Sequence, residues 1–268
     1  MASKDLSAPF TLYAATYSSC SLMVLMTYEM RGAPREGRPE MKLERKFIDI
    51  SRKGGEQLSE FFLLKVNPKG QVPVLVNEKL LEKPLTESVD ISYYIADWYP
   101  SLLPPQHEQV IRELVDEMHE ISYKLLTFGT ETKLPQLSRN WLLEQAKRTD
   151  ISTEYKKALE YKAELIKGWA DNHSEKDLAV NEERTRKFCA KILALMEKRP
   201  EEKDKFTYIF GPEPTVLDAH AVVFFGRVYD KERLDLLPPT LVKWHEDIRK
   251  TDLWKRAVPN GTTLPPAW

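Results

Sequence analysis

Segments with the pattern of β-strands are confined to the first hundred residues of this 268-residue chain. Short apolar runs predict four strands, at Phe10–Tyr13, Lys42–Ile50, Pro73–Val76 and Leu80–Glu82. Helical spacing of apolar residues predicts three helices among them, at Ser19–Met30, Glu56–Lys65 and Ser88–Trp98. Strands that alternate with helices favour an α/β layer with parallel neighbours, closed here by one hairpin after Pro73.

After this region the strand pattern largely disappears. The segment Tyr99–Pro105 contains three prolines in seven residues and is the best linker candidate. Beyond it, apolar spacing predicts helices at Val110–Leu125, Tyr155–Trp169, Glu182–Lys198, Val216–Tyr229 and Leu241–Arg256. The fourth of these is apolar on nearly every face, which predicts a buried central helix. We therefore predict an α/β domain over residues 1–100 and an all-helical domain over residues 105–268.

Charge and cysteine content exclude several classes of protein. With 40 basic and 41 acidic residues, the net charge of −1 predicts no general attraction to nucleic acid or to an anionic membrane. We expect no membrane span, because no apolar run reaches about 18 residues. Two cysteines exclude a disulfide scaffold, and five scattered histidines predict no metal site. We expect a cytoplasmic protein.

The first motif with chemical potential is Ser18-Ser19-Cys20-Ser21, at the predicted start of the first helix. Serine is a common N-cap residue, so capping alone is one interpretation. In the other, the hydroxyl and the free N–H groups of the helix start stabilise an anion such as a thiolate. That interaction would lower the pKa of a bound thiol.

Two further motifs follow in the same region. In Gln71-Val72-Pro73 the proline opens a strand, and a cis bond before it would expose the backbone of Val72 for pairing with a short peptide. A trans loop proline is the alternative. In Thr86-Glu87-Ser88 either the residues only cap the next helix, or Glu87 binds an ammonium group while Ser88 and nearby N–H groups bind a carboxylate.

The order and spacing of these motifs resemble the thioredoxin-like domain of the glutathione transferase family over about residues 8–100. The Ser-Ser-Cys motif is similar to that of the zeta class. A Thr-x-x-Asp capping box, which begins the core helix of the second domain in this family, is matched by Thr215 and Asp218. The resemblance implies the glutathione transferase fold, with an α/β thioredoxin-like N-terminal domain and an all-α C-terminal domain that forms the second-substrate site.

The resemblance also implies roles for single residues, with glutathione as cosubstrate. Ser18 would stabilise the glutathione thiolate, and Ser19 and Cys20 would lie beside it. The other implied glutathione contacts are Gln57, Gln71, Val72 before a cis Pro73, Glu87 and Ser88. By analogy with the family we expect a homodimer that acts on a small-molecule electrophile.

The chain departs from the zeta pattern directly after the motif. An aromatic residue and two arginines normally follow it, whereas here the helix continues as Leu22–Met26. The missing cations argue against a dianionic substrate such as that of maleylacetoacetate isomerisation. We therefore expect a small, mostly apolar electrophile, converted by conjugation or by glutathione-dependent cis–trans isomerisation. A fungal-type enzyme of specialised metabolism fits by analogy.

Two other functions stay open from the sequence. The same fold hosts non-catalytic interaction modules, which the motifs do not exclude. Cys20 near a helix start could itself be the nucleophile of a glutaredoxin-like thiol transferase. Cys189 lies on an apolar helical face with Phe188 and Ile192, which predicts a core thiol.

Overall fold

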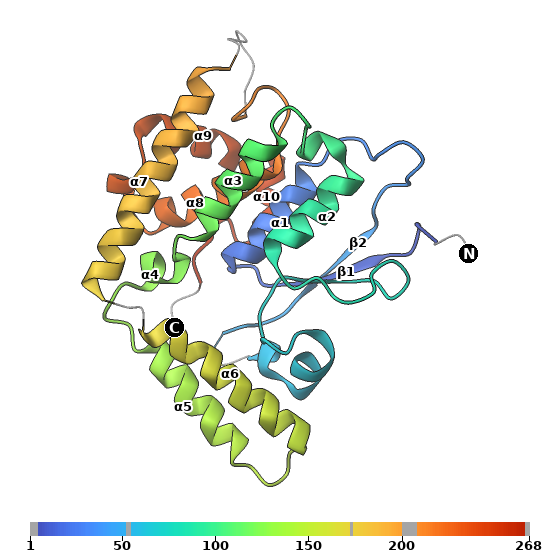
Figure 1. Cartoon of the computed structure of the whole chain (residues 1–268), viewed down its shortest axis with the longest axis vertical. Helices are drawn as coiled ribbons and strands as arrows, with labels where there is room; N and C mark the ends of the chain where they lie inside the picture. Colours follow the sequence, from blue (N-terminus) through green and yellow to red (C-terminus); the bar gives the residue numbers. More distant parts are fainter. Residues whose placement is uncertain (1–4, 52–54, 172–173, 200–207, 266–268) are drawn as a thin grey trace.

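A three-stranded mixed sheet forms the N-terminal part of the computed structural model, which describes residues 5–51, 55–171, 174–199 and 208–265. The central strand β1 (Phe10–Ala14) pairs in parallel with β2 (Leu43–Phe47) and antiparallel with β3 (Val74–Val76) (Figure 1). The parallel pair requires the crossover helix α1 (Ser19–Glu29) between its strands, as the alternating pattern predicts.

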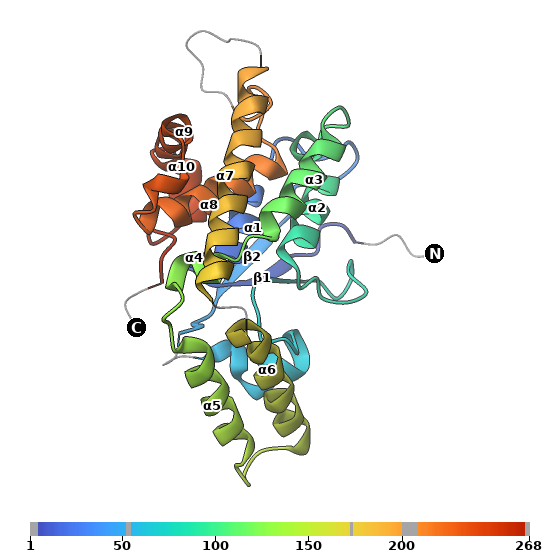
Figure 2. The ribbon, with the colours of Figure 1, turned by 60° about the vertical axis from the view of Figure 1, so that its left-hand side comes forward.

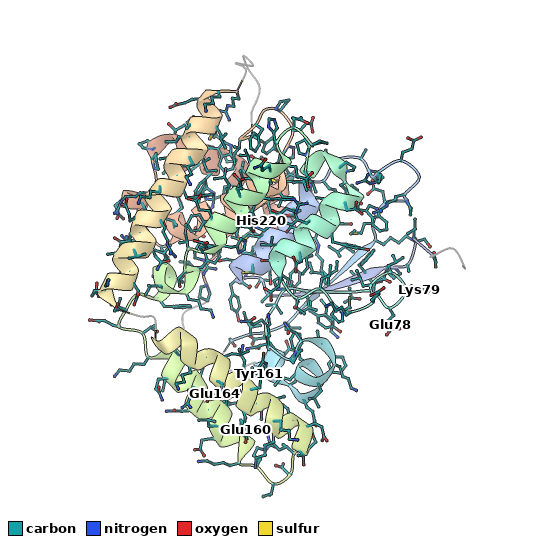
Figure 3. All side chains as sticks on the ribbon, in the orientation of Figure 1. Glu78, Lys79, Glu160, Tyr161, Glu164 and His220 are labelled. Carbon is teal, nitrogen blue, oxygen red and sulfur yellow. The ribbon has the colours of Figure 1, made fainter. Side chains whose placement is uncertain are left out.

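The predicted fourth strand, at Leu80–Glu82, is wrong. Its place is taken by a turn built on Asn77, whose Oδ1 accepts hydrogen bonds from the N–H groups of Lys79 and Leu80. The chain rejoins the sheet only at Leu85, which forms an isolated bridge with Leu75. Figure 3 labels Lys79 on this turn. The Asn side chain therefore replaces the expected hairpin ladder with local hydrogen bonds.

One predicted helix, Glu56–Lys65, is divided in two. A 3₁₀ turn η1 (Glu56–Leu58) is followed by a π-helical turn η2 (Phe62–Val66). Ser59 between them has extended backbone (φ −63°, ψ 153°), which ends the first turn. Apolar spacing alone did not reveal this break, because the buried residues still fall on one side of the segment.

The rest of the described chain is helical, as predicted. Ser122 and Thr251 each cap a new helix within a segment that apolar spacing predicts as continuous, so two predicted helices are broken. A helix at α5 was not predicted. The helices after β3 are α2 (Ser88–Trp98), η3 (Pro100–Leu102), α3 (Glu108–His119), α4 (Tyr123–Phe128), α5 (Leu134–Ala146), α6 (Thr153–Asp171), α7 (Glu175–Glu197), α8 (Val216–Asp230), η4 (Leu234–Leu236), α9 (Pro239–Arg249) and α10 (Asp252–Ala257).

Helix α8 lies at the centre of the helical part, and nearly all its residues are buried, which confirms the prediction. It packs against α1, so one apolar cluster runs through both parts and includes Phe10, Leu25, Trp98 and Phe224. Burial of aromatic and aliphatic side chains on this scale is the main stabilising term of such a fold. The domain limits at 1–100 and 105–268 stay a prediction, because this core is continuous.

Helices α5 and α6 form a hairpin that projects from this body (Figures 1 and 2). Helix α6 packs against η2 of the N-terminal part, and the Tyr155 hydroxyl of α6 donates a hydrogen bond to the carbonyl of Leu58 on η1. A small separate apolar cluster joins α5, α6 and η2. Its buried members are Leu63, Leu142, Ala146, Ala158, Leu159 and Ala163. The second part of the chain therefore contacts the first through α8 and α10, which pack on α1, and through this hairpin.

Candidate functional site

The first element of the candidate site is the start of α1. Ser18 is the N-cap, with extended backbone (φ −82°, ψ 115°), and its Oγ accepts a 3.3 Å hydrogen bond from the N–H of Ser21. The side chain is half-buried, and its hydroxyl donates to no other described residue. Because helix N-termini also present unpaired N–H groups, this position can bind an anion with Ser18 as a donor.

The next two residues differ in accessibility. Ser19 is 7% exposed, and its buried Oγ has no hydrogen-bond partner among the described residues. Burial raises the pKa of the half-buried Cys20 thiol, against a hydrogen bond from Ser88 and the positive charges of Lys124 and Arg227, which lower it. The net effect favours the neutral thiol, so Cys20 lacks the ready thiolate that a redox nucleophile needs.

The second element is the turn before β3. The Val72–Pro73 bond is cis, in agreement with one of the two alternatives drawn from the sequence. The side-chain amide of Asn67 donates a 2.9 Å hydrogen bond to the carbonyl of Gln71 and so closes the turn. The backbone of Val72 makes no hydrogen bond to any described residue, which leaves one donor and one acceptor for a ligand.

The third element is the start of α2. Ser88 is 6% exposed, whereas Glu87 is the N-cap residue, without a side-chain cap bond, and is open to solvent. One carboxylate oxygen of Glu87 accepts a 2.6 Å hydrogen bond from the ammonium group of Lys69. Any ammonium group of a ligand would therefore share or replace this cation.

Contacts join the predicted elements in series. Helices α1 and α2 pack against each other, and Ser88 at the start of α2 lowers the pKa of Cys20 in the first turn of α1. Lys69 and Glu87 connect α2 to the turn before β3. That turn packs on η1, since a Cβ atom at Gly70 would come within 3.1 Å of the carbonyl oxygen of Gln57.

Gln57 has a side-chain hydrogen-bond acceptor that no described residue uses. Its side-chain amide donates a 3.4 Å hydrogen bond to the carbonyl of Ile50, while its Oε1 is buried without a partner among the described residues. An unpaired buried acceptor is costly, so a ligand donor at this position would be favourable.

Arg227, which the sequence motifs did not indicate, contacts the residue before Ser18 from the helical part of the chain. Arg227 on α8 is 6% exposed and donates a 2.8 Å hydrogen bond to the carbonyl of Tyr17, directly before Ser18. Its other bonds reach Thr127 at 3.1 Å and Thr263 at 3.2 Å. Burial lowers the pKa of Arg227 only to about 10, so it stays a cation at neutral pH. The signal for it in the sequence was the one basic residue among the apolar residues Val222–Val228 of α8.

A cavity of about 460 Å³ opens where the start of α4, the end of α6 and the start of α7 meet. Lys124 lines this cavity, and its positive charge lowers the pKa of the Cys20 thiol. The lining is mainly polar: Glu120, Ser122, Lys124, Gly168, Asp177, Val180, Asn181 and Arg184.

A buried serine–histidine pair elsewhere is not a second active site. Ser92 Oγ lies 2.8 Å from His220 Nε2, and His220 Nδ1 lies 3.0 Å from His119 Nε2. Ser92 and His220 are fully buried, and Figure 3 shows His220 within the helical body. Burial lowers the pKa of His119 to about 4, so this neutral chain joins α2, α8 and α3 and offers a substrate no access.

The described residues contain neither a metal-binding cluster nor a membrane-spanning helix. Across the described residues, no group of three or more His, Cys, Asp or Glu side chains could hold a metal ion. Within the same ranges, no helix has both the length and the apolar character that crossing a membrane requires.

One family model matches the N-terminal part of the chain. Residues 9–97 match the family model described as glutathione S-transferase, N-terminal domain. These residues contain the α1 start, the cis Val72–Pro73 turn and the α2 start. No curated protein matches the chain in sequence.

Solved structures extend the likeness to nearly the whole chain. A Nilaparvata lugens delta-class glutathione transferase is 19% identical, with a TM-score of 0.54 over 94% of each chain. A bacterial zeta-class maleyl pyruvate isomerase in its holo form is 18% identical, with a TM-score of 0.55 over 94% of this chain and 98% of that one. A maleylacetoacetate isomerase from Methylobacterium extorquens AM1, with bound malonate and GSH, is 17% identical, with a TM-score of 0.55 over 96% and 100%.

The chain has the glutathione transferase fold. Its small mixed sheet forms the thioredoxin-like N-terminal domain, and helices α3–α10 form the helical C-terminal region. The fold prediction made from the Ser18, Val72-Pro73 and Glu87-Ser88 motifs is therefore confirmed. At these identities, the likeness establishes the fold alone.

Proposed function

We propose that this protein is a glutathione-dependent enzyme in which Ser18 stabilises the glutathione thiolate. The observation that carries the proposal is the half-buried Ser18 hydroxyl at the α1 start, which still has a hydrogen to donate. The match of residues 9–97 to a glutathione S-transferase domain supports it, as does the similar structure solved with bound GSH.

Glutathione would be held by three groups of contacts. The free N–H and C=O of Val72 would pair with the backbone of its cysteinyl unit. Ser88 and the first N–H groups of α2 would bind the γ-glutamyl carboxylate, and Glu87 would bind the γ-glutamyl ammonium in competition with Lys69. Gln57 and Gln71 would contact the remaining peptide groups of glutathione.

The reaction would begin with loss of the thiol proton of glutathione. A hydrogen bond from Ser18 and the positive end of the α1 dipole would favour the thiolate. The buried cation Arg227, which donates to the carbonyl of Tyr17, would add positive electrostatic potential at the same place. Ser19 and Cys20 would lie beside the sulfur. The thiolate would then add to a small electrophile, which is the step that conjugation and cis–trans isomerisation share.

The second substrate would bind against the helical region. Helix α1 contains no basic residue, and this absence of positive charge supports a mostly apolar electrophile. We further propose a cytoplasmic homodimer with a role in specialised metabolism, which rests on analogy with the family.

The decisive experiment measures binding to immobilised glutathione and turnover of 1-chloro-2,4-dinitrobenzene. We expect Ser18→Ala to lower turnover about 100-fold, as for loss of one donor to a developing anion, with a smaller effect on glutathione binding. Thr251→Ala, which removes the N-cap hydroxyl of α10, is the matched control and should leave turnover unchanged.

Other outcomes would redirect the assignment. Unchanged turnover in Ser18→Ala contradicts the proposed mechanism. Absence of both retention and turnover in the wild type would instead favour a non-catalytic interaction module. A glutathione adduct on Cys20, with loss of activity in Cys20→Ala, would favour the thiol transferase, although burial of that thiol disfavours it.

A further inference from the structure

A lysine of the α5–α6 hairpin is buried against the N-terminal part. Lys162 on α6 is 9% exposed, and its Nζ donates hydrogen bonds to the carbonyl oxygens of Lys69 at 2.7 Å and Gly70 at 3.1 Å. No carboxylate pairs with it in the described ranges. Burying an ammonium group without an anion costs free energy, so the two carbonyl contacts call for an explanation other than gross stability.

The loop that Lys162 contacts is the one that leads into Val72. It is tightly wound: the N–H of Gly70 donates to the carbonyl of Asn67 at 2.8 Å, and Gly70 has a positive φ of 56°. A Cβ atom at Gly70 would approach the side chain of Leu63 to 3.0 Å. One side of the loop therefore packs on η1 and η2, while two of its carbonyl groups accept hydrogen bonds from Lys162.

Two proposed glutathione contacts depend on this loop. Val72 follows it directly, so the direction of its free N–H and C=O is set by the peptide units before it. Lys69, whose carbonyl accepts from Lys162, extends its side chain to Glu87 at the start of α2. One amino group on α6 therefore fixes the backbone between two ligand-binding elements.

The hairpin that carries Lys162 is itself held firmly in place. Tyr155, two turns earlier on α6, donates a 2.7 Å hydrogen bond from its hydroxyl to the carbonyl of Leu58 on η1. Ala158, Leu159 and Ala163 flank Lys162 in the apolar cluster with Leu63. Figure 3 labels its neighbour Tyr161 on the same helix.

We propose that Lys162 is a positioning residue that sets the Asn67–Gln71 loop for glutathione and thereby makes the α5–α6 hairpin part of the glutathione site. The inference rests on the proposed function for its ligand, and on the two hydrogen bonds for its mechanism. Lys162 touches neither the sulfur nor the electrophile in this scheme, so its removal should weaken glutathione binding without slowing the chemical step.

The test compares Lys162→Met, which keeps the length and removes the donors, with Lys157→Met, which changes an exposed lysine of the same helix. In ligand-free protein we expect Lys162→Met to speed amide hydrogen exchange in residues 67–72 about tenfold. With 1-chloro-2,4-dinitrobenzene, we expect the KM for glutathione to rise about tenfold while kcat at saturating glutathione stays within about twofold. Lys157→Met should change neither quantity, and Lys162→Arg should recover part of the exchange protection.

Each result bears on a separate claim. Unchanged exchange in Lys162→Met overturns the proposal, and so does faster exchange with an unchanged KM for glutathione. If the wild type binds no glutathione, the proposed function fails, and the exchange measurement alone decides whether Lys162 holds the loop. If Lys162→Met does not fold, Lys162→Ala, which also removes the donors, replaces it with the same expectations.

Discussion

Two helix starts in this molecule use hydroxyl caps in different ways. At α8 the cap is complete: Thr215 and Asp218 bond each other reciprocally, and both are fully buried. At α1 the cap is partial, because Ser18 accepts one 3.3 Å bond, is half-buried and has a hydrogen to spare. The same local motif therefore stabilises structure at α8 and leaves bonding capacity for a ligand at α1.

The difference comes from what surrounds each helix start. Asp218 also accepts a 2.7 Å hydrogen bond from the N–H of Ile209, so both of its carboxylate oxygens accept hydrogen bonds from the protein. At the α1 start, Arg227 donates to the carbonyl of Tyr17 and α2 packs alongside, but among the described residues the Ser18 hydroxyl donates to no acceptor. A ligand site is therefore indicated by a capping hydroxyl that still has a hydrogen to donate, and not by the presence of a capping residue alone.

The largest effect expected from this comparison is at Asp218. Asp218→Ala should lower the free energy of unfolding by about 3 kcal/mol, because three hydrogen bonds of 2.6–2.8 Å lose their acceptor inside the core. Chemical denaturation would measure it. Asp218→Asn, which keeps one acceptor oxygen, should recover part of the loss, and a cost below about 1 kcal/mol would contradict the closed cap.

The next effect concerns pH and the buried Lys162. Burial lowers its pKa from 10.5 to about 7, so between these values the unfolded chain binds more protons than the folded one. Stability therefore rises with pH in this range, by about 2 kcal/mol from pH 7 to 9 for this group. The difference in unfolding free energy between wild type and Lys162→Met, measured across that range, isolates the contribution. A difference independent of pH would show that the lysine is not buried as described.

A smaller effect is expected for stability at Ser18. Ser18→Ala should lower the free energy of unfolding by about 1 kcal/mol or less, since one long N-cap bond on a half-buried residue is lost. Thermal unfolding would measure it, beside Thr251→Ala at α10 as a cap of comparable length. A loss as large as that of Asp218→Ala would make Ser18 a structural cap and weaken the proposed catalytic role.

The smallest effect is expected at Cys20. Because burial raises the pKa of its thiol, alkylation by iodoacetamide at neutral pH should be slow, and Cys20→Ala should keep turnover within about twofold. Cys189→Ala serves as the control, since that thiol is fully buried. Rapid alkylation at Cys20 together with lost turnover would overturn the assignment of Ser18 as the thiolate-stabilising group.

Motifs defined by neighbouring residues were predictable from the sequence. The Ser18 cap, the alternatives for Val72-Pro73 and the Thr215–Asp218 capping box all depend on hydrogen bonds within a few residues, so spacing reveals them. The predictions failed where a side chain redirected the backbone. Asn77 replaced the expected Leu80–Glu82 strand by a turn, and Ser59 divided the expected Glu56–Lys65 helix.

By itself, the sequence determined the alternation of strands and helices, the change to helices after Tyr99–Pro105 and the three motifs of the candidate site. Only the tertiary structure decided which cations support that site. Arg227 and Lys162 lie far along the chain from Tyr17 and Gly70, and they reach these residues through the packing of α8 and α6. Such contacts depend on the burial of whole helix faces, which no local spacing records.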